Sequence, residues 1–431
     1  MNAMTPDPTG AIDPSAPLPA LRALEAFPVE HEGRQLIGLR DPLAIASGVL
    51  LVAMPVYYLA AQLDGQSTTR DLQADFASRF GQIVAAEQVA VLVRQLDEAL
   101  LLATPRFEEA FAAVRRAFDE AAVRPAFHAG LCFPAAEAEA LAAIDAYFTH
   151  PRGPGPLAAV AGAAAGPPAG AVFAPHYDPR RGGFLLAQAF ARVAQAGLLE
   201  RVVVLGTNHQ PSTALFTATR KAFATPFGVV RAEECALEVL AARYPGDLFA
   251  EEFCHRREHS IEFQVVMLAY VWKKLGRGEP PPVVPILVGS FHEFYGGEPV
   301  DDGRVRAIAE GLAAVAVEGA GRTLLVASGD LAHVGPRFGD EAPMDAAFLA
   351  AVEEDDRAVM AAMAAGSAAG FHRTIARHED RRRMCGHSCG YMLMRAYEAM
   401  DPSAYRGAVL GYEMARDPDG AVSYCAVAFS R

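Results

Sequence analysis

Apolar residues in the first quarter of the chain recur at helical spacing. Leu72, Phe76 and Phe80 lie four residues apart, which predicts a helix over TRDLQADFASRF with Thr68 or Thr69 as its cap. Further helical patterns cover residues 86–101 and 107–120. These patterns predict a small, mostly helical module.

This module is expected to span residues 35–120 and to precede a larger domain over residues 121–431. Residues 1–34 are polar and Pro-rich, without a signal-peptide pattern, and we interpret them as a disordered leader. The apolar run of residues 48–63 carries Pro55 and is too short to span a bilayer, so it is expected to be buried.

From residue 171 onward, short apolar runs alternate with helical patterns. The predicted strands cover residues 171–175, 201–206, 282–289 and 323–330, and the predicted helices cover 182–197, 235–244, 260–276 and 305–317. The runs are rich in Val and Leu without alternation, as expected for strands covered on both faces. The larger domain is therefore predicted to be α/β, with a central, mostly parallel or mixed sheet flanked by helices and ending in a strand pair.

Polar residues follow the ends of these predicted strands. They are His176, Tyr177 and Asp178 after the first strand, Asn208 and His209 after the second, and Asp330 and His333 after the last. A lone histidine at a strand end is often only a solvated residue. Because the carboxyl ends of strands form the ligand crevice of an open α/β sheet, several such residues at successive ends indicate a shared site.

Two further segments carry reactive side chains. His259 stands at the start of a predicted helix, where it either faces the same crevice or has no ligand role beyond the helix cap. Cys385 and Cys389 lie beside glycines in MCGHSCG, as a redox pair or as joint metal ligands, although their spacing is not the usual one. Imidazoles and a thiolate bind Zn²⁺, Fe²⁺ or copper well, and a three-ligand site keeps positions open for substrate.

Composition and charge exclude several classes of protein. Hydrophobic residues make up 52% and charged residues 21% of the 431 residues, which is a globular balance. The net charge of −13 argues against nucleic acid as a partner. Six scattered cysteines do not form a disulfide scaffold. We expect a cytoplasmic protein that neither binds nucleic acid nor spans a membrane.

An ordered set of motifs resembles the MEMO family, known in bacteria as AmmeMemoRadiSam system protein B. The motifs are RPAFHAGLCFP, APHYD, VVVLGTNHQP, TPFG, EHSIEFQ, VPILVG, SGDLAHVG and MCG, between about residues 123 and 431. The resemblance implies a fold similar to that of the class III extradiol ring-cleaving dioxygenases. It also implies that His176, His209 and Cys385 are the metal ligands.

The same resemblance implies roles for residues around the metal. His259 and His333 match family histidines, and one of this kind serves as acid/base in the related dioxygenases. Asp330 is expected to orient His333 or to line the pocket. Glu262 is expected to contact the ligands from behind, because metal-bound imidazoles usually donate their other N–H to such a group. Tyr177 and Asn208 are expected to line the pocket.

The chain departs from the family pattern in three ways. Asp178 stands near a position where the family usually has glycine, and so adds a carboxylate beside His176. The module before Arg124 is outside the family pattern; the order LDG, TTRDL, helix, helix, LL resembles small winged-helix PqqD-like domains, and a packing module without a ligand is the alternative. Finally, a cysteine ligand replaces the carboxylate of the dioxygenases, so their activity does not follow from the fold.

Three functions remain open. The first is a mononuclear Fe(II)-dependent oxidoreductase, similar to a dioxygenase, that acts on a small molecule or peptide. The second is a non-catalytic module that binds peptides or proteins, and the third is a zinc-dependent hydrolase. We expect Fe(II) as the metal, with zinc or copper as alternatives. The family's bacterial name implies companion proteins, including a radical-SAM enzyme, as partners.

Overall fold

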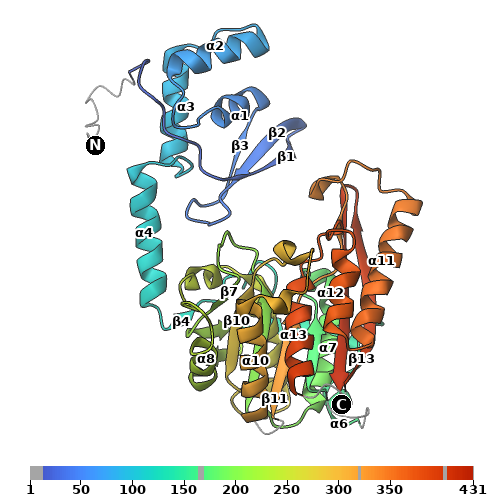
Figure 1. The fold of residues 1–431 in the computed structure, drawn as a ribbon. Coiled ribbons are helices and arrows are strands. Elements are labelled where there is room, and N and C mark those ends of the chain that lie inside the picture. Colours follow the sequence, from blue (N-terminus) through green and yellow to red (C-terminus); the bar gives the residue numbers. More distant parts are fainter. Residues whose placement is uncertain (1–12, 164–168, 319–321, 401–404, 431) are drawn as a thin grey trace. The chain divides into compact units, whose positions relative to one another are not determined.

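The computed structural model describes residues 13–163, 169–318, 322–400 and 405–430. The chain divides into two compact units, residues 1–120 and 121–431. Within the described ranges, no helix combines the length and apolar character that crossing a membrane requires. The two units are described separately below (Figure 1).

The N-terminal unit combines a small antiparallel sheet with four helices. The sheet order is β1-β2-β3, formed by Glu25–His31, Arg34–Arg40 and Val49–Val52. The helices are α1 (Met54–Ala61), α2 (Thr69–Phe80), α3 (Ala86–Glu98) and α4 (Pro105–Glu120). Within the predicted bounds of residues 35–120 the module is mostly helical, as predicted, whereas the apolar run at residues 48–63 divides into a strand and a helix.

The expected leader over residues 1–34 is wrong for its second half. Leu18 is 2% exposed and packs into the core of the unit, and residues 25–31 form β1. Burial of apolar side chains fixes this segment despite its polar composition. Residues 1–12 lie outside the described residues.

The predicted cap of α2 is confirmed. The Thr68 N–H donates to the Asp71 carboxylate (2.8 Å), and the Asp71 N–H donates to the Thr68 hydroxyl (3.3 Å), which forms a capping box. Gly81, with φ +67°, ends the helix in the left-handed conformation. Leu72 and Phe76 then face the core of the unit.

The C-terminal unit contains the predicted α/β sheet, which is mixed. Its order is β12-β14-β5-β11-β6-β10-β7, with β13 paired to β14. The strands are β5 (Ala171–Ala174), β6 (Arg201–Thr207), β7 (Phe216–Ala218), β10 (Val283–Val288), β11 (Thr323–Ser328), β12 (His333–Val334), β13 (Arg406–Asp417) and β14 (Gly420–Ser430). The pairs β5–β11, β11–β6 and β6–β10 are parallel, so these strands end at one edge. A second sheet joins β4 (Val123–Arg124), β8 (Ala222–Thr225) and β9 (Gly228–Val230).

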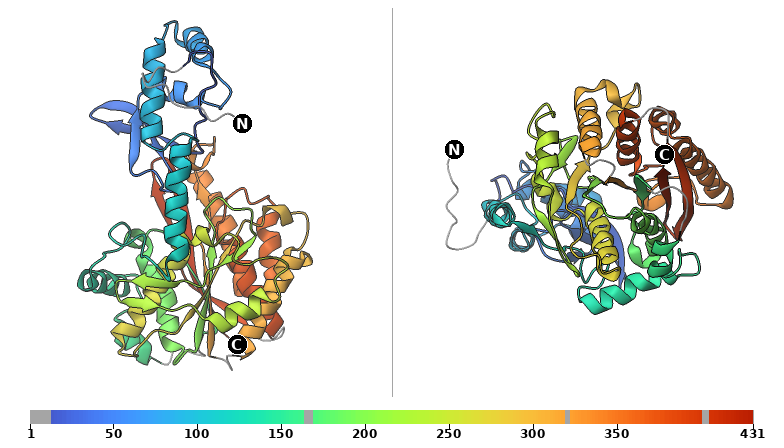
Figure 2. Two further views of the ribbon diagram at one scale, coloured as in Figure 1. Left: turned by 90° about the vertical axis from the view of Figure 1, so that its left-hand side faces the viewer. Right: turned by 90° about the horizontal axis from the view of Figure 1, so that it is seen from below.

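Helices cover both faces of the main sheet (Figures 1 and 2). One face packs on α8 (Glu234–Ala241), α10 (Gly303–Glu318), α11 (Ala346–Ala364), α12 (Ala368–Ala376) and α13 (His387–Met400). The other packs on α5 (Glu137–Thr149), α6 (Leu157–Gly162), α7 (Pro179–Gln195) and α9 (His259–Lys274). This two-sided cover explains the continuous apolar strands.

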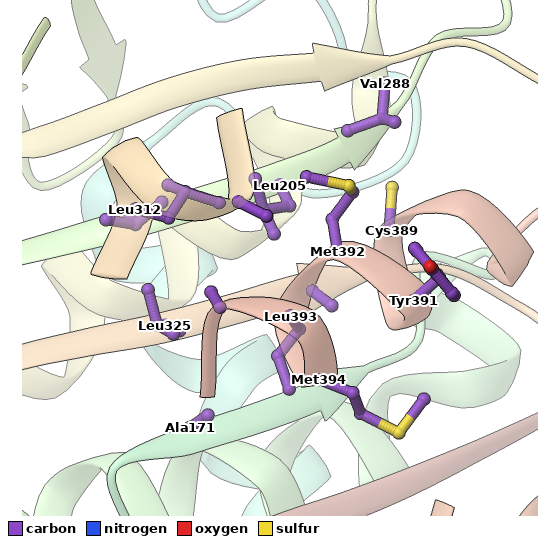
Figure 3. Packing of buried hydrophobic residues seen from close by; sticks show 14 of the residues in the cluster. Ala171, Leu205, Val288, Leu312, Leu325, Cys389, Tyr391, Met392, Leu393 and Met394 are labelled. Carbon is purple, nitrogen blue, oxygen red and sulfur yellow. The ribbon is translucent and has the colours of Figure 1, made fainter. Parts of the chain in front are cut away.

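The core beneath α13 fixes the segment that carries Cys385. Figure 3 shows Met392, Leu393 and Met394 of α13 among the side chains of the sheet, and all three are fully buried. The helices at residues 346–364, 368–376 and 387–400 were not predicted from the sequence. These helices hold Cys385 against the ends of the strands.

Candidate metal centre

His176, His209 and Cys385 converge at the carboxyl edge of the parallel strands. His176 follows β5, His209 follows β6, and Cys385 lies just before α13. One ligand atom from each of the three lies within 4.8 Å of the others. The Cys385 Sγ is 3.2 Å from the His176 Nε2. The strands and α13 thus bring together residues that are far apart in the sequence.

A hydrogen-bond chain from β11 and α9 holds the His176 imidazole. Its Nδ1 lies 3.2 Å from the Ser328 hydroxyl. That hydroxyl donates to the Ser260 carbonyl (2.6 Å) and accepts from the Gln264 amide (2.9 Å). Because the hydroxyl proton is already used, His176 Nδ1 is the donor and its Nε2 carries the lone pair. Burial lowers the pKa of His176 well below its ordinary value, which favours the neutral imidazole that metals bind.

A buried carboxylate holds the second imidazole. Glu258 is 1% exposed; one of its oxygens lies 3.0 Å from His209 Nδ1, and the other accepts from the His209 backbone N–H (2.8 Å). Burial lowers the pKa of His209, but the charge and hydrogen bond of Glu258 outweigh it and raise the pKa. The His209 Nε2 is left for a metal, in the arrangement that orients metal-bound histidines in general.

Close packing of the backbone sets the position of Cys385. A Cβ on Gly386 would lie 2.8 Å from the Asp330 carbonyl oxygen, and a Cβ on Gly329 would lie 2.2 Å from the Gly386 Cα. These glycines let the start of α13 approach the end of β11, rather than letting the backbone approach a ligand. The Asp330 N–H points at the Cys385 sulfur (3.2 Å). Burial raises the pKa of the thiol, so a bound cation would be needed to hold it as thiolate near neutral pH.

Cys385 lines a neighbouring cavity of about 390 Å³, and the two ligand histidines, His176 and His209, line an open cavity of about 410 Å³. His259, His333 and Asp330 line it together with Tyr177, Asp178 and Phe263. Burial lowers the pKa values of His259 and His333 to about 4 and raises that of Asp330 to about 7. The wall therefore offers two neutral imidazoles and a carboxyl group that titrates near neutral pH.

Several predicted residues have contacts other than those expected. Glu262 does not support a ligand histidine: its carboxylate contacts His128 and Arg124, and the carboxylate that supports His209 is Glu258. His333 Nδ1 faces the carbonyls of Leu331 and Arg383, whereas the Asp330 carboxylate accepts from the backbone N–H groups of His176 and Tyr177.

Asp178 and Asn208 are also placed by local contacts. Asp178 caps α7 and forms an ion pair with Arg180, so its carboxylate is held at the cavity rim by its own helix. Asn208 lines a neighbouring cavity of about 390 Å³ and accepts from the Gln210 N–H (3.0 Å).

Sequence reasoning missed His128, Glu258 and Ser328. Glu258 directly precedes His259 in the EHSIE segment, and His128 stands in RPAFHAG, so their motifs were visible but their partners were not. Ser328, at the end of β11, gave no signal of its own.

The donor set fits a transition metal. Two imidazoles with their lone pairs on Nε2 and one thiol suit Zn²⁺, Fe²⁺ or copper, and the open cavity leaves room for further ligands. Two other triads overlap with it, His209–Glu258–His259 and Asp330–His333–Cys385. Glu258 is already engaged by hydrogen bonds to both of its histidines, so the His176–His209–Cys385 triad is the better candidate.

Comparison with known proteins gives a consistent family. Residues 124–428 match the family model described as Memo-like protein. A MEMO1 family protein of Thermus thermophilus is 30% identical over 273 residues, covering 63% of this chain and 73% of that protein. One of Methanopyrus kandleri is 30% identical over 308 residues, covering 70% and 97%, respectively. One of Aquifex aeolicus is 25% identical over 321 residues, covering 73% and 76%. The match covers the whole metal centre, and the chain belongs to the Memo-like family.

Proposed function

We propose that the chain is a mononuclear non-haem metal enzyme that uses Fe(II) to oxidise a small or peptidic substrate with dioxygen. The observation that supports this most is the convergence of His176, His209 and Cys385 within 4.8 Å beside an open cavity. Three protein ligands leave coordination positions for substrate and oxidant. A site with only a structural role usually closes its coordination sphere with four protein ligands.

The residues of the chain divide the work. His176, His209 and Cys385 would hold the metal, which when bound supplies redox chemistry and polarises bound oxygen atoms. His259 and His333 stay neutral near pH 7, because burial lowers their pKa values to about 4, and as neutral imidazoles they can form hydrogen bonds with a substrate in the cavity. Phe263 and Val422 give the wall an apolar part that displaces water from the substrate.

A cysteine ligand binds zinc as well as iron or copper, so the ligand set alone does not decide between a redox metal and zinc. Two histidines, one cysteine and a water molecule also describe a catalytic zinc site, so a hydrolase is the second candidate. Metal identity separates the two. The remaining alternative, a peptide-binding module without catalysis, requires no metal at all.

The test is the metal content of the full-length protein purified without oxygen, measured by mass spectrometry. Cys385→Ala and His209→Ala remove one ligand each, and His150→Ala is the matched control, because His150 is an exposed histidine of the same unit that lines neither of the two cavities beside the ligands. Iron at one per chain in the natural protein and the control, but lost from both ligand variants, supports the oxidoreductase. Zinc in the same pattern supports the hydrolase instead. Folded protein without metal contradicts both and leaves the binding module.

A further inference from the structure

His128 and Glu262 form a hydrogen-bonded pair on the wall of the cavity, apart from the metal ligands. The His128 backbone N–H donates to one oxygen of Glu262 (2.8 Å), and the other oxygen lies 3.1 Å from His128 Nδ1. Two contacts from one residue to one carboxylate fix both the position and the rotation of the imidazole ring. His128 also lines the cavity of about 410 Å³ that the ligand histidines His176 and His209 line.

The Glu262 side chain is ionised although it is buried. Arg124, itself 0% exposed, approaches the same carboxylate to 2.6 Å and donates to the His255 and Glu258 carbonyls (2.5 and 2.8 Å). Burial alone raises the pKa of Glu262, but the hydrogen bond from His128 and the charge of Arg124 lower it. The cavity wall thus contains a buried ion pair of Glu262 and Arg124, whose carboxylate lies directly behind an imidazole.

This arrangement determines which nitrogen of His128 faces the cavity. Glu262 is a hydrogen-bond acceptor, so His128 Nδ1 carries the proton and Nε2 carries the lone pair. Within the described residues, Nε2 has no protein partner, and the side chain is 16% exposed. The ring meets His259 and Phe263 edge-on, with centroids 5.8 and 5.6 Å apart, so it cannot turn away without losing these contacts.

The other two cavity histidines outside the ligand set have weaker or shared support. His259 Nδ1 lies 3.2 Å from a Glu258 oxygen that His209 and the Ser260 N–H also use. His333 Nδ1 faces only backbone carbonyls. His128 is therefore the one among these three with a carboxylate that no metal ligand shares. A buried carboxylate behind Nδ1 is the arrangement that makes Nε2 an effective general base.

We propose that His128 is a further catalytic residue, the general base for a hydroxyl group of a small substrate bound in this cavity. The O–H bond of the substrate breaks, its proton moves to His128 Nε2, and the electron pair stays on the oxygen. The resulting imidazolium keeps its Nδ1–H bond to Glu262, whose charge stabilises it, and later returns the proton to product or water. This deepens the proposed function and rests on it for the reaction that follows, but the base itself requires no metal.

The first test measures acylation of histidines by diethyl pyrocarbonate in the metal-free, full-length protein. Peptide mapping by mass spectrometry gives the rate at His128 relative to exposed His292 in the same sample. We expect His128 to react and Glu262→Gln to slow its acylation by about tenfold, taking the lower end of the loss seen when a metal-bound imidazole loses its carboxylate partner. Glu310→Gln, an exposed glutamate on α10, should change nothing. An unreactive His128, or equal rates in Glu262→Gln and the natural protein, would overturn the proposal.

The second test uses 4-nitrophenol, whose anion is yellow and whose neutral form is colourless. At a pH where the free phenol is mostly neutral, the natural metal-free protein should bind it as the anion. In His128→Gln the amide still donates to Glu262, so the fold is retained, but bound phenol should stay colourless. The same yellow absorbance in both proteins, or no binding to either, would refute the proposal that His128 is a general base. If the protein binds one iron per chain but His128 fails both tests, the proposed function stands and the role of His128 is refuted. If His128 passes both tests but the protein binds no metal, only the proposed function is contradicted.

Discussion

Glu258→Gln is the substitution that examines the metal centre most directly without touching a ligand. The Glu258 side chain accepts from the His209 backbone N–H (2.8 Å) and the Ser260 N–H (3.0 Å), and contacts the Nδ1 atoms of His209 (3.0 Å) and His259 (3.2 Å). A glutamine has the same size but only one accepting oxygen. Its amide N–H₂ would face at least one of the N–H groups that now point at a carboxylate.

The magnitude follows from which contacts survive. Although burial disfavours the charged form, the charge of His209 and its hydrogen bond hold the pKa of Glu258 well below its usual value, so the natural side chain is a carboxylate at neutral pH. Loss of such a partner behind a metal-bound imidazole typically weakens metal binding by about 10–100-fold. That factor equals about 1.4–2.7 kcal/mol of binding free energy. The fold should tolerate the change, because the side-chain volume is kept.

Zn²⁺ affinity, measured by competition with a chromophoric chelator, gives the result directly. Glu310→Gln serves as the matched control, because Glu310 is exposed on α10 and lines neither cavity beside the proposed ligands. Circular dichroism establishes that both variants are folded. Natural affinity in folded Glu258→Gln would refute the claim that this carboxylate orients His209 for a metal.

Three further predictions follow from the same contacts. Gly386→Ala would place a Cβ 2.6 Å from the Phe173 ring and 2.8 Å from the Asp330 carbonyl oxygen. We therefore expect this variant to lose about 1–3 kcal/mol of folding stability, seen as a lower melting temperature, and to bind metal more weakly. Gly296→Ala, whose Cβ would meet no atom within 4 Å, should change neither property. Burial raises the pKa of Asp356 from 3.8 to about 6, so ionisation of this buried carboxyl destabilises the fold as the pH rises, by up to about 3 kcal/mol above pH 6. Asp356→Asn still accepts the hydrogen bond from Tyr412 and should raise the melting temperature above pH 7 but not at pH 4. An equal effect at both pH values would contradict the burial argument. Residues 121–431 alone should bind metal with the affinity of the full chain, since every ligand and its polar partners lie in that unit; a weaker fragment would assign part of the site to residues 1–120.

The sheet and two ligands could be predicted because their signals are local. Each parallel strand is a short apolar run, and His176 and His209 stand directly after two of them. The geometry of parallel strands then brings those side chains to one edge without any further information. The assignment of Cys385 as a ligand depended instead on the family motif, because no periodic pattern predicted helix α13.

The remaining features depend on contacts between distant segments. Glu258 and His209 are separated by 49 positions, and Glu262 and His128 by 134. The spacing of residues in the sequence therefore does not predict which carboxylate pairs with which histidine. Glu262 was expected to contact the ligand histidines because metal-bound imidazoles usually donate to a carboxylate, but its carboxylate contacts His128 and Arg124 instead. Likewise Leu18 packs into a core formed by residues between 39 and 102, later in the chain, which composition alone does not reveal.

The Nδ1 partners of the histidines give each ring a different role within one cavity. His209 is backed by a carboxylate, and His176 by the Ser328 hydroxyl, which brings no charge. A carboxylate raises the basicity of the opposite nitrogen, so His209 is the stronger of the two imidazole donors. Burial keeps His176 neutral, so it binds without competing with a proton. The site therefore combines one strong and one permanently available imidazole with a thiol that ionises only when a cation is present, so the deprotonation of Cys385 is coupled to metal binding itself.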